Sequence, residues 1–210
     1  MIGSVATVVG FIIVTIVSLE ALFVSPGRQH LFAWHPFLMS MGALGLSTAG
    51  IQAIRSRWGT KGIQSKTRRV QLHSVLSNGG LLCMLGGQYA IYTNKERMGK
   101  PHFTSWHAYF GLLTFALWAA NVAVAGTNSA DFSNKRLVFL WRSRNKRWLG
   151  AATYTLGLVA VSLGLHSAWG VGSFGVRGAW AMTSSIGAIY FCVISQGLGV
   201  IPVAEKKDVR

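Results

Sequence analysis

Long apolar segments without lysine or arginine constrain this chain more than any other feature. Charged residues make up only 12% of its 210 residues, whereas soluble domains carry about 25%. The 20 lysines and arginines lie in blocks, and none falls inside the apolar segments between the blocks. A helix needs roughly 20 apolar residues to cross a bilayer. The pattern predicts six membrane spans, over residues 4–24, 33–54, 70–92, 106–126, 148–169 and 180–203.

These spans are expected to be helical. Only helices and closed barrels satisfy backbone hydrogen bonds in lipid, and no span shows the alternation of a barrel strand. The chain is therefore predicted to be all-α, a single integral membrane domain over residues 1–210 that forms a six-helix bundle. Haem held between the second to fifth helices is the expectation developed below.

The basic blocks predict the orientation of the bundle in the bilayer. Fifteen lysines and arginines lie between spans two and three, between spans four and five, and in the C-terminal tail, against five on the opposite side. Because basic loops favour the cytoplasm, both termini are expected to be cytoplasmic. A nucleic-acid partner is disfavoured, since the basic residues flank apolar spans and do not alternate with exposed aromatics. An endomembrane and the plasma membrane both remain open.

Three histidines lie at the starts of predicted spans: His35, His73 and His107. Polar groups at this depth are costly without partners. Spans two and four enter from the same side, so His35 and His107 share one depth, and His73 lies near the opposite face. Facing helices in a bundle can supply the axial ligands of haem iron. The sequence predicts an outer haem site at His35 and His107, and His73 as a ligand of a second, inner site.

Glycines follow each of these histidines. They allow either a flat macrocycle between helices or ordinary close helix packing. Beside the histidines we favour the macrocycle for Gly42, Gly45, Gly50, Gly79, Gly80, Gly86, Gly87 and Gly111. His166, at the outer end of span five, is a weaker competitor for the outer haem.

Three motifs carry a resemblance to a known family: Trp34-His35-Pro36-Phe37-Leu38-Met39-Ser40, Arg69-Val70-Gln71-Leu72-His73, and Gly99-Lys100-Pro101-His102. The chain resembles the cytochrome b-561 family, most closely its short six-span branch, over roughly residues 5–200. The resemblance implies a transmembrane oxidoreductase with two haems b. It would carry electrons from cytoplasmic ascorbate to monodehydroascorbate or a ferric chelate on the opposite side. A homodimer is left open.

The resemblance also implies ligand pairs between helices two and four and between helices three and five. The family's fourth ligand is a histidine at the cytoplasmic start of helix five, where this chain has Lys146. Three arrangements are consistent with that lysine. His73 could hold the inner haem alone, a neutral Lys146 amine could be the sixth ligand, or the inner haem could be weakly bound or absent.

Ligation suggests the chemistry and the docking sites. Iron held by two imidazoles has no open position, so it relays electrons, and no catalytic residue apart from that relay is predicted. Ascorbate is an anion and requires cationic partners. The cytoplasmic candidates are Lys66, Arg68 and Arg69, which could equally bind haem propionates or only anchor the helix end. Lys100 and His102 are the candidates for contact with the outer acceptor.

Two other functions remain open from the sequence. A haem-binding sensor or structural protein that does not conduct electrons across the bilayer would explain the missing fourth histidine. A cofactor-free transporter is less favoured, because the span interiors lack charged residues and show no inverted repeat or broken helix pair.

Overall fold

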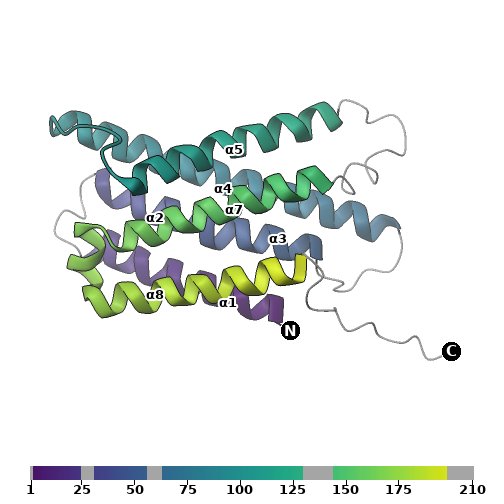
Figure 1. Ribbon diagram of the computed structural model, residues 1–210, viewed down its shortest axis with the longest axis horizontal. Coiled ribbons are helices and arrows are strands. Elements are labelled where there is room, and N and C mark those ends of the chain that lie inside the picture. Colours follow the sequence, from purple (N-terminus) through teal and green to yellow (C-terminus); the bar gives the residue numbers. More distant parts are fainter. Residues whose placement is uncertain (1, 25–30, 56–62, 130–143, 198–210) are drawn as a thin grey trace.

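The computed structural model describes residues 2–24, 31–55, 63–129 and 144–197. In these residues the chain forms helical rods that pack lengthwise as one layered bundle (Figure 1). The first rod is α1 (Ile2–Leu19), which continues into the π-helical turn η1 (Glu20–Val24). The structure confirms the predicted all-α bundle.

The second rod contains a wide turn. It consists of η2 (Leu31–Ala33), α2 (Trp34–Ser40), the π-helical η3 (Met41–Leu46) and α3 (Ser47–Arg55). A π-helical turn leaves backbone groups out of the α-helical pattern. Ser47 compensates, since both its backbone N–H and its Oγ donate to the Gly42 carbonyl, the hydroxyl at 2.6 Å. Pro36 lies in the first turn of α2, where proline is tolerated.

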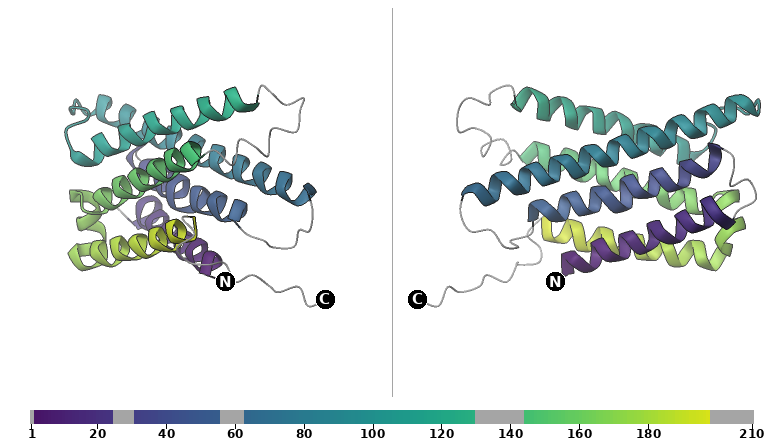
Figure 2. Two further views of the ribbon diagram at one scale, coloured as in Figure 1. Left: turned by 45° about the vertical axis from the view of Figure 1, so that its right-hand side comes forward. Right: turned by 180° about the vertical axis from the view of Figure 1, so that it is seen from behind.

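Together with the first two rods, the remaining four helices form two hairpins and an outer pair. The helices are α4 (Ile63–Arg97), α5 (Trp106–Ser129), α7 (Arg144–Leu165) and α8 (Ala168–Gly197). α4 packs against α2, η3 and α3 and runs the whole length of the bundle (Figure 2). α5 packs against α7, and α8 packs against both α7 and α1. The chain is therefore built from neighbouring antiparallel rods, as short connections require.

Small residues bring α4 and the second rod into backbone contact. A Cβ atom on Gly42 would lie 2.6 Å from the Gly80 carbonyl oxygen, and one on Gly80 would lie 2.9 Å from that of Gly42. A Cβ atom on Gly50 would lie 3.0 Å from Ser77 Oγ, and one on Gly87 would lie 3.3 Å from the His35 carbonyl oxygen. The interpretation of these four glycines as space for a macrocycle was wrong. They allow close helix packing, which membrane helices favour.

The helix ends differ from the predicted spans in the last third of the chain. The fifth span was predicted to end at residue 169 and the sixth to begin at residue 180, but α7 ends at Leu165 and α8 begins at Ala168. Ser167 caps α8, because its Oγ accepts the Gly170 N–H at 3.3 Å. The glycine-rich start of α8 remains helical apart from a kink at Gly175, whose φ is 68°. Residues 198–203 of the predicted span lie outside the described residues.

Three stretches of the described chain have the length and composition of a membrane span. Within the described residues, Val5–Val24, Leu31–Ile54 and Arg147–Leu165 are long and apolar enough to cross a membrane. They correspond to three of the six predicted spans. The rods α4, α5 and α8 are at least as long, and they pack beside these three.

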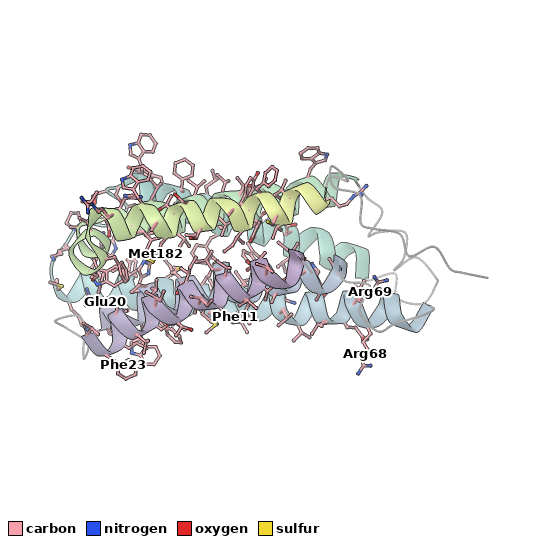
Figure 3. The ribbon with its side chains drawn as sticks, turned by 90° about the horizontal axis from the view of Figure 1, so that it is seen from below. Phe11, Glu20, Phe23, Arg68, Arg69 and Met182 are labelled. Carbon is pink, nitrogen blue, oxygen red and sulfur yellow. The ribbon has the colours of Figure 1, made fainter. Side chains whose placement is uncertain are left out.

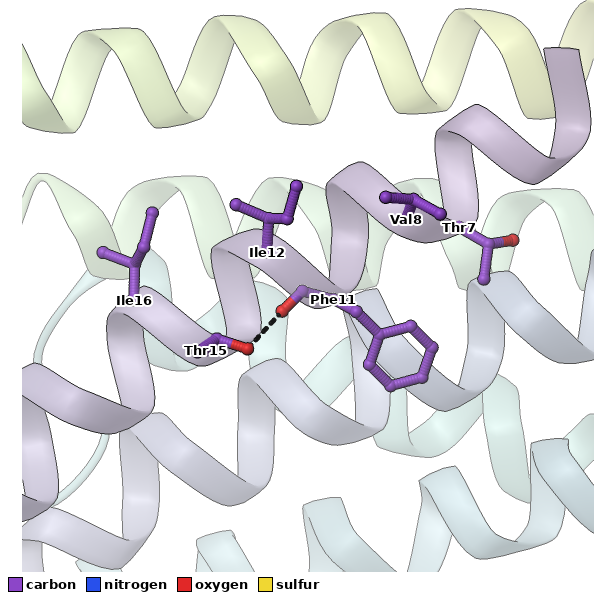
Figure 4. A pocket seen from close by; sticks show the side chains of 6 residues that line it. All are labelled: Thr7, Val8, Phe11, Ile12, Thr15 and Ile16. Atoms are coloured by element: carbon purple, nitrogen blue, oxygen red, sulfur yellow. Dashed lines mark hydrogen bonds between the residues drawn. The ribbon is translucent and has the colours of Figure 1, made fainter.

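Apolar side chains also cover the outside of the bundle, as they do in a protein surrounded by lipid. A shallow hollow of about 360 Å³ on α1 illustrates this surface (Figure 4). One helix supplies its whole wall, and the Thr15 hydroxyl there donates to the Phe11 carbonyl at 2.9 Å. We assign this hollow to the lipid-facing surface and look for the functional site between the helices.

Candidate functional site

The histidines divide the bundle into two ends. The start of α2, the end of α4, the start of α5 and the α7–α8 corner meet at one end, here called the His35 end (Figure 1). The end of α3 and the starts of α4 and α7 meet at the other, here called the His73 end (Figure 1). The two ends correspond to the outer and inner faces expected from the sequence.

The structure brings His35 and His107 together at the His35 end. Their ring centres lie 5.9 Å apart, and the ring planes are nearly perpendicular, at 89°. His35 Nδ1 donates to the Gly87 carbonyl of α4 at 3.1 Å, and His107 Nδ1 donates to the Ala160 carbonyl of α7 at 2.8 Å. Because a carbonyl oxygen only accepts, Nδ1 carries a proton in both rings, and in a neutral ring this leaves the lone pair on Nε2.

His73 is held in the same way at the opposite end. Its Nδ1 donates to the Gly50 carbonyl of α3 at 3.0 Å. Each of the three predicted ligands thus gives its Nδ1 proton to a backbone carbonyl on a neighbouring rod. Metal-binding histidines characteristically use such a bond to fix the ring and its tautomer, and to make Nε2 the ligand atom.

The spacing of His35 and His107 fits a metal ion held between two imidazoles. Metal–nitrogen bonds of about 2 Å on each side place the two ring centres about 6 Å apart, and the observed separation is 5.9 Å. The pair also joins the two hairpins, since α2 packs on α4 and α5 packs on α7. These two residues are the ones that would hold a haem iron at this end of the bundle.

The two histidine levels are well separated along α4. From His73 to Gly87, the acceptor for His35, the helix advances 14 residues. At about 1.5 Å per residue the levels are about 21 Å apart. His73 therefore cannot share an iron with the pair at the His35 end, in agreement with its prediction as a ligand of a second site.

The predicted cationic residues at the His73 end are only partly described. The side chains of Lys66 and Lys146 lie outside the described residues, although both positions are helical. Arg68 is exposed and projects away from the bundle, whereas Arg69 is half-buried (Figure 3). Arg69 precedes His73 by four residues on α4, which places the two on one helix face. The structure thus separates Arg68 from the His73 face.

The loop after α4, at the His35 end, holds His102 against the end of that helix. Gly99, with a φ of 60°, ends the helix in a Schellman motif, since its N–H donates to the Glu96 carbonyl and the Lys100 N–H donates to the Lys95 carbonyl. His102 Nε2 lies 2.7 Å from Glu96 Oε1, and its ring stacks on Tyr92 at 4.2 Å. Lys100 is exposed beside it.

His166 does not reach the pair. Its Nε2 lies 3.1 Å from Thr183 Oγ1, and its ring packs edge-on against Trp180 at 4.6 Å. The Nε2 atom, which an iron ligand would need, is thus engaged by Thr183 on α8. The weak prediction that it competes for the outer haem was wrong.

Sequence reasoning missed the groups that position the ligands. The carbonyls of Gly50, Gly87 and Ala160 carry no sequence signal, because every residue has a carbonyl. Gly164 was also missed: a Cβ atom there would lie 3.1 Å from His107 Cε1 and 3.2 Å from Nδ1. The His107 ring therefore lies directly on the backbone of α7. Gly164 differs from a glycine that only allows helix packing by its contact with this histidine, which is visible only in the structure.

Comparison with known proteins agrees with this geometry. The family model for eukaryotic cytochrome b561 matches residues 34–170, which include His35, His73 and His107. The curated transmembrane reductase CYB561D2 of Bos taurus is 31% identical over 153 residues, covering 71% of this chain and 67% of the relative. The protein of that name from Mus musculus is 30% identical over 164 residues, covering 76% and 71%. A probable transmembrane reductase, CYB561D1 of Homo sapiens, is 26% identical and covers 69% and 62%. With the family model matching well over half of its length, this chain belongs to the cytochrome b561 family of helical membrane proteins.

Proposed function

We propose that the protein carries electrons across a membrane from cytoplasmic ascorbate, through two haems b, to monodehydroascorbate or a ferric chelate on the opposite side. Membership of a cytochrome b family implies haem b, and the relatives are named transmembrane reductases. The number of haems, the donor, the acceptor and the cytoplasmic position of both termini are part of the proposal.

One observation carries the proposal. His35, His73 and His107 all donate Nδ1–H to a carbonyl of a neighbouring rod, at two levels of one bundle. His102 and His166 instead engage Nε2 with side chains. The three residues suited to iron are thus distinguished by geometry from two that are not, and they are the three whose placement matches the family's ligands.

Each part of the proposed relay has a defined role. Haem, when bound, supplies a one-electron carrier whose iron has no open position between two imidazoles. The carbonyls of Gly87 and Ala160 keep His35 and His107 in the ligand tautomer and fix the rings. The hairpins shield the site from water, since polar groups in this setting are satisfied inside the protein.

Docking of the donor is assigned to the His73 end. Arg69 shares a face of α4 with His73, and Lys66 precedes His73 by seven residues, two turns along the same face. Both are candidates for binding the ascorbate anion or a haem propionate. Arg68, which projects away from the bundle, is better placed for lipid headgroups.

Contact with the acceptor is assigned to the outer loop. Glu96 and Tyr92 fix the ring of His102, and Lys100 adds an exposed positive charge beside it. An anionic acceptor such as monodehydroascorbate or a ferric chelate would meet this charge close to the outer haem. Proteoliposomes test the function: with ascorbate trapped at the His73 side, an external ferric chelate should be reduced, and empty liposomes should reduce none.

The sensor or structural hypothesis remains the second candidate because Lys146 stands where the family has a histidine. It predicts haem that binds and changes colour with redox state but passes no electrons across the vesicle. A protein that reduces the external acceptor only when ascorbate is added on that same side would support this alternative and contradict transmembrane transfer.

Substitution of the glycine beneath His107 should damage the outer site. Gly164→Ala places a Cβ atom 3.1 Å from the ring, so the ring must shift. Misplacing a ligand through its support typically weakens metal binding by about 10- to 100-fold. We expect less haem per chain and a shifted Soret band. Gly187→Ala on α8 is the control, because Gly187 is exposed and no atom lies within 4 Å of its added methyl group. Equal spectra for both variants would contradict the placement of His107.

A further inference from the structure

A buried amide near the His73 end has no partner in the part of the chain that the structure describes. Gln52, on α3, is half-buried as a residue, but its Nε2 is enclosed and makes no hydrogen bond there. Native proteins rarely leave such a donor unsatisfied, because its lost hydration is not repaid. An orphaned donor inside a membrane bundle therefore indicates a missing acceptor.

The surroundings of Gln52 locate that acceptor. Thr48 lies one turn before Gln52 on the same face of α3, is fully buried, and shares a 2.8 Å hydrogen bond with the Tyr154 hydroxyl of α7. α3 and α7 run in opposite directions (Figure 1). Gln52 therefore lies one turn closer to the His73 end than this bond, on the side of α3 that faces α7.

His73 lies on the side of α3 that faces α4. Gly50, whose carbonyl accepts the His73 Nδ1–H, lies only two residues before Gln52. Gln52 is thus slightly closer to the end of the bundle than the proposed inner ligand, and only three residues before Arg55, where α3 ends. A group bound by His73 between α4 and α7 would extend past Gln52 as it approaches the bundle end.

We propose that the Gln52 amide donates a hydrogen bond to a propionate carboxylate of the haem held by His73. The inference rests on the proposed inner haem. A propionate is the chemistry that fits, because it is an anionic acceptor on the edge of a macrocycle and charged acceptors give the stronger hydrogen bonds to an amide. The half-buried Arg69 on the His73 face of α4 supplies positive charge at the same end.

The test measures the inner haem directly in the full-length purified protein. Gln52→Leu removes the donor and Gln52→Glu replaces it with a second carboxylate. Gln71→Leu is the matched control, because Gln71 is exposed on α4 near the same level. Haem loss to apomyoglobin and the propionate bending band in resonance Raman spectra are recorded for each.

In Gln52→Leu we expect the haem at the His35 end to be lost at an unchanged rate. The inner haem should be lost about tenfold faster, because one hydrogen bond to a charged group contributes on this scale. Gln52→Glu should leave faster still, and one propionate band should shift in both. Gln71→Leu should match the unmodified protein in both measurements.

Two outcomes overturn the inference in different ways. Two haems per chain with unchanged loss rates and Raman bands, together with a higher Tm of the haem-free Gln52→Leu protein, would show that Gln52 meets only a water molecule; the proposed function would stand. A single haem per chain that survives His73→Ala would remove the inner site, and with it both this inference and the two-haem relay.

Discussion

Replacing His107 with alanine is expected to abolish the haem at the His35 end. The change removes one of two rings whose centres lie 5.9 Å apart and also removes the hydrogen bond to the Ala160 carbonyl. Loss of a positioning partner alone typically costs about 10- to 100-fold in metal affinity, so loss of the ligand should exceed that. Haem per chain should fall by one equivalent, and transfer of electrons across proteoliposomes should stop.

The same result is expected for His35→Ala, because the pair acts as a unit. His166→Ala is the control: it removes a half-buried histidine from the same end, but one whose Nε2 faces Thr183. Its haem content and spectrum should match those of the unmodified protein.

A second variant separates loss of the ligand from loss of the fold. His107→Gly leaves a space the size of an imidazole beside Gly164, so added imidazole should restore the Soret band of the outer haem. A protein that keeps its full spectrum after either alanine substitution would contradict the outer site. A protein that loses the spectrum without rescue by imidazole would show that the variant had misfolded.

The sequence was sufficient for the architecture because charge and lipid constrain it strongly. All twenty basic residues lie outside the apolar segments, and this division of the sequence predicted the rods and their order. The error at the start of α8 has a local cause. Residues 170–179 were left between two predicted spans, but they lie in α8, because lipid disfavours unpaired backbone groups and Ser167 supplies the helix cap.

The proximity of His35 and His107 was also accessible from sequence, since both lie at the starts of spans that enter the membrane from the same side. The groups that hold these two rings in place could not be predicted from sequence. The Nδ1 acceptors are carbonyls, and the contact between Gly42 and Gly80 depends on the register of two rods. That register follows from the packing of many side chains together. The glycines were therefore assigned to the cofactor, whereas four of them bring helices together.

Polar pairs between helices were missed for the same reason. Thr48 bonds Tyr154 across α3 and α7, and Asn121 donates to Thr153 Oγ1 across α5 and α7 at 2.7 Å. Threonine, asparagine and tyrosine also occur in membrane helices where they satisfy only their own backbone, as Thr114 does. Sequence alone does not say which of them crosses to another helix.

Replacing Lys146 with histidine is expected to strengthen the inner haem. α7 begins at Arg144, so position 146 lies in its first turn, at the His73 end. It precedes Tyr154 by eight residues, slightly more than two turns, and Tyr154 is fixed to α3 by its bond to Thr48. A histidine at this position would supply the second imidazole that the family uses and that this chain lacks.

The expected effect is slower loss of the inner haem, by about 10- to 100-fold, the range in which single contributors to metal sites act. Arg147→His is the control, because Arg147 is the next residue along and its side chain is exposed. Haem transfer to apomyoglobin measures the rate, and the spectrum of the reduced protein reports a change in ligation. A gain confined to Lys146→His would identify position 146 as the ligand position, because adjacent residues point about 100° apart around a helix. Equal rates for the two variants and the unmodified protein would show that the inner iron takes its second ligand from elsewhere.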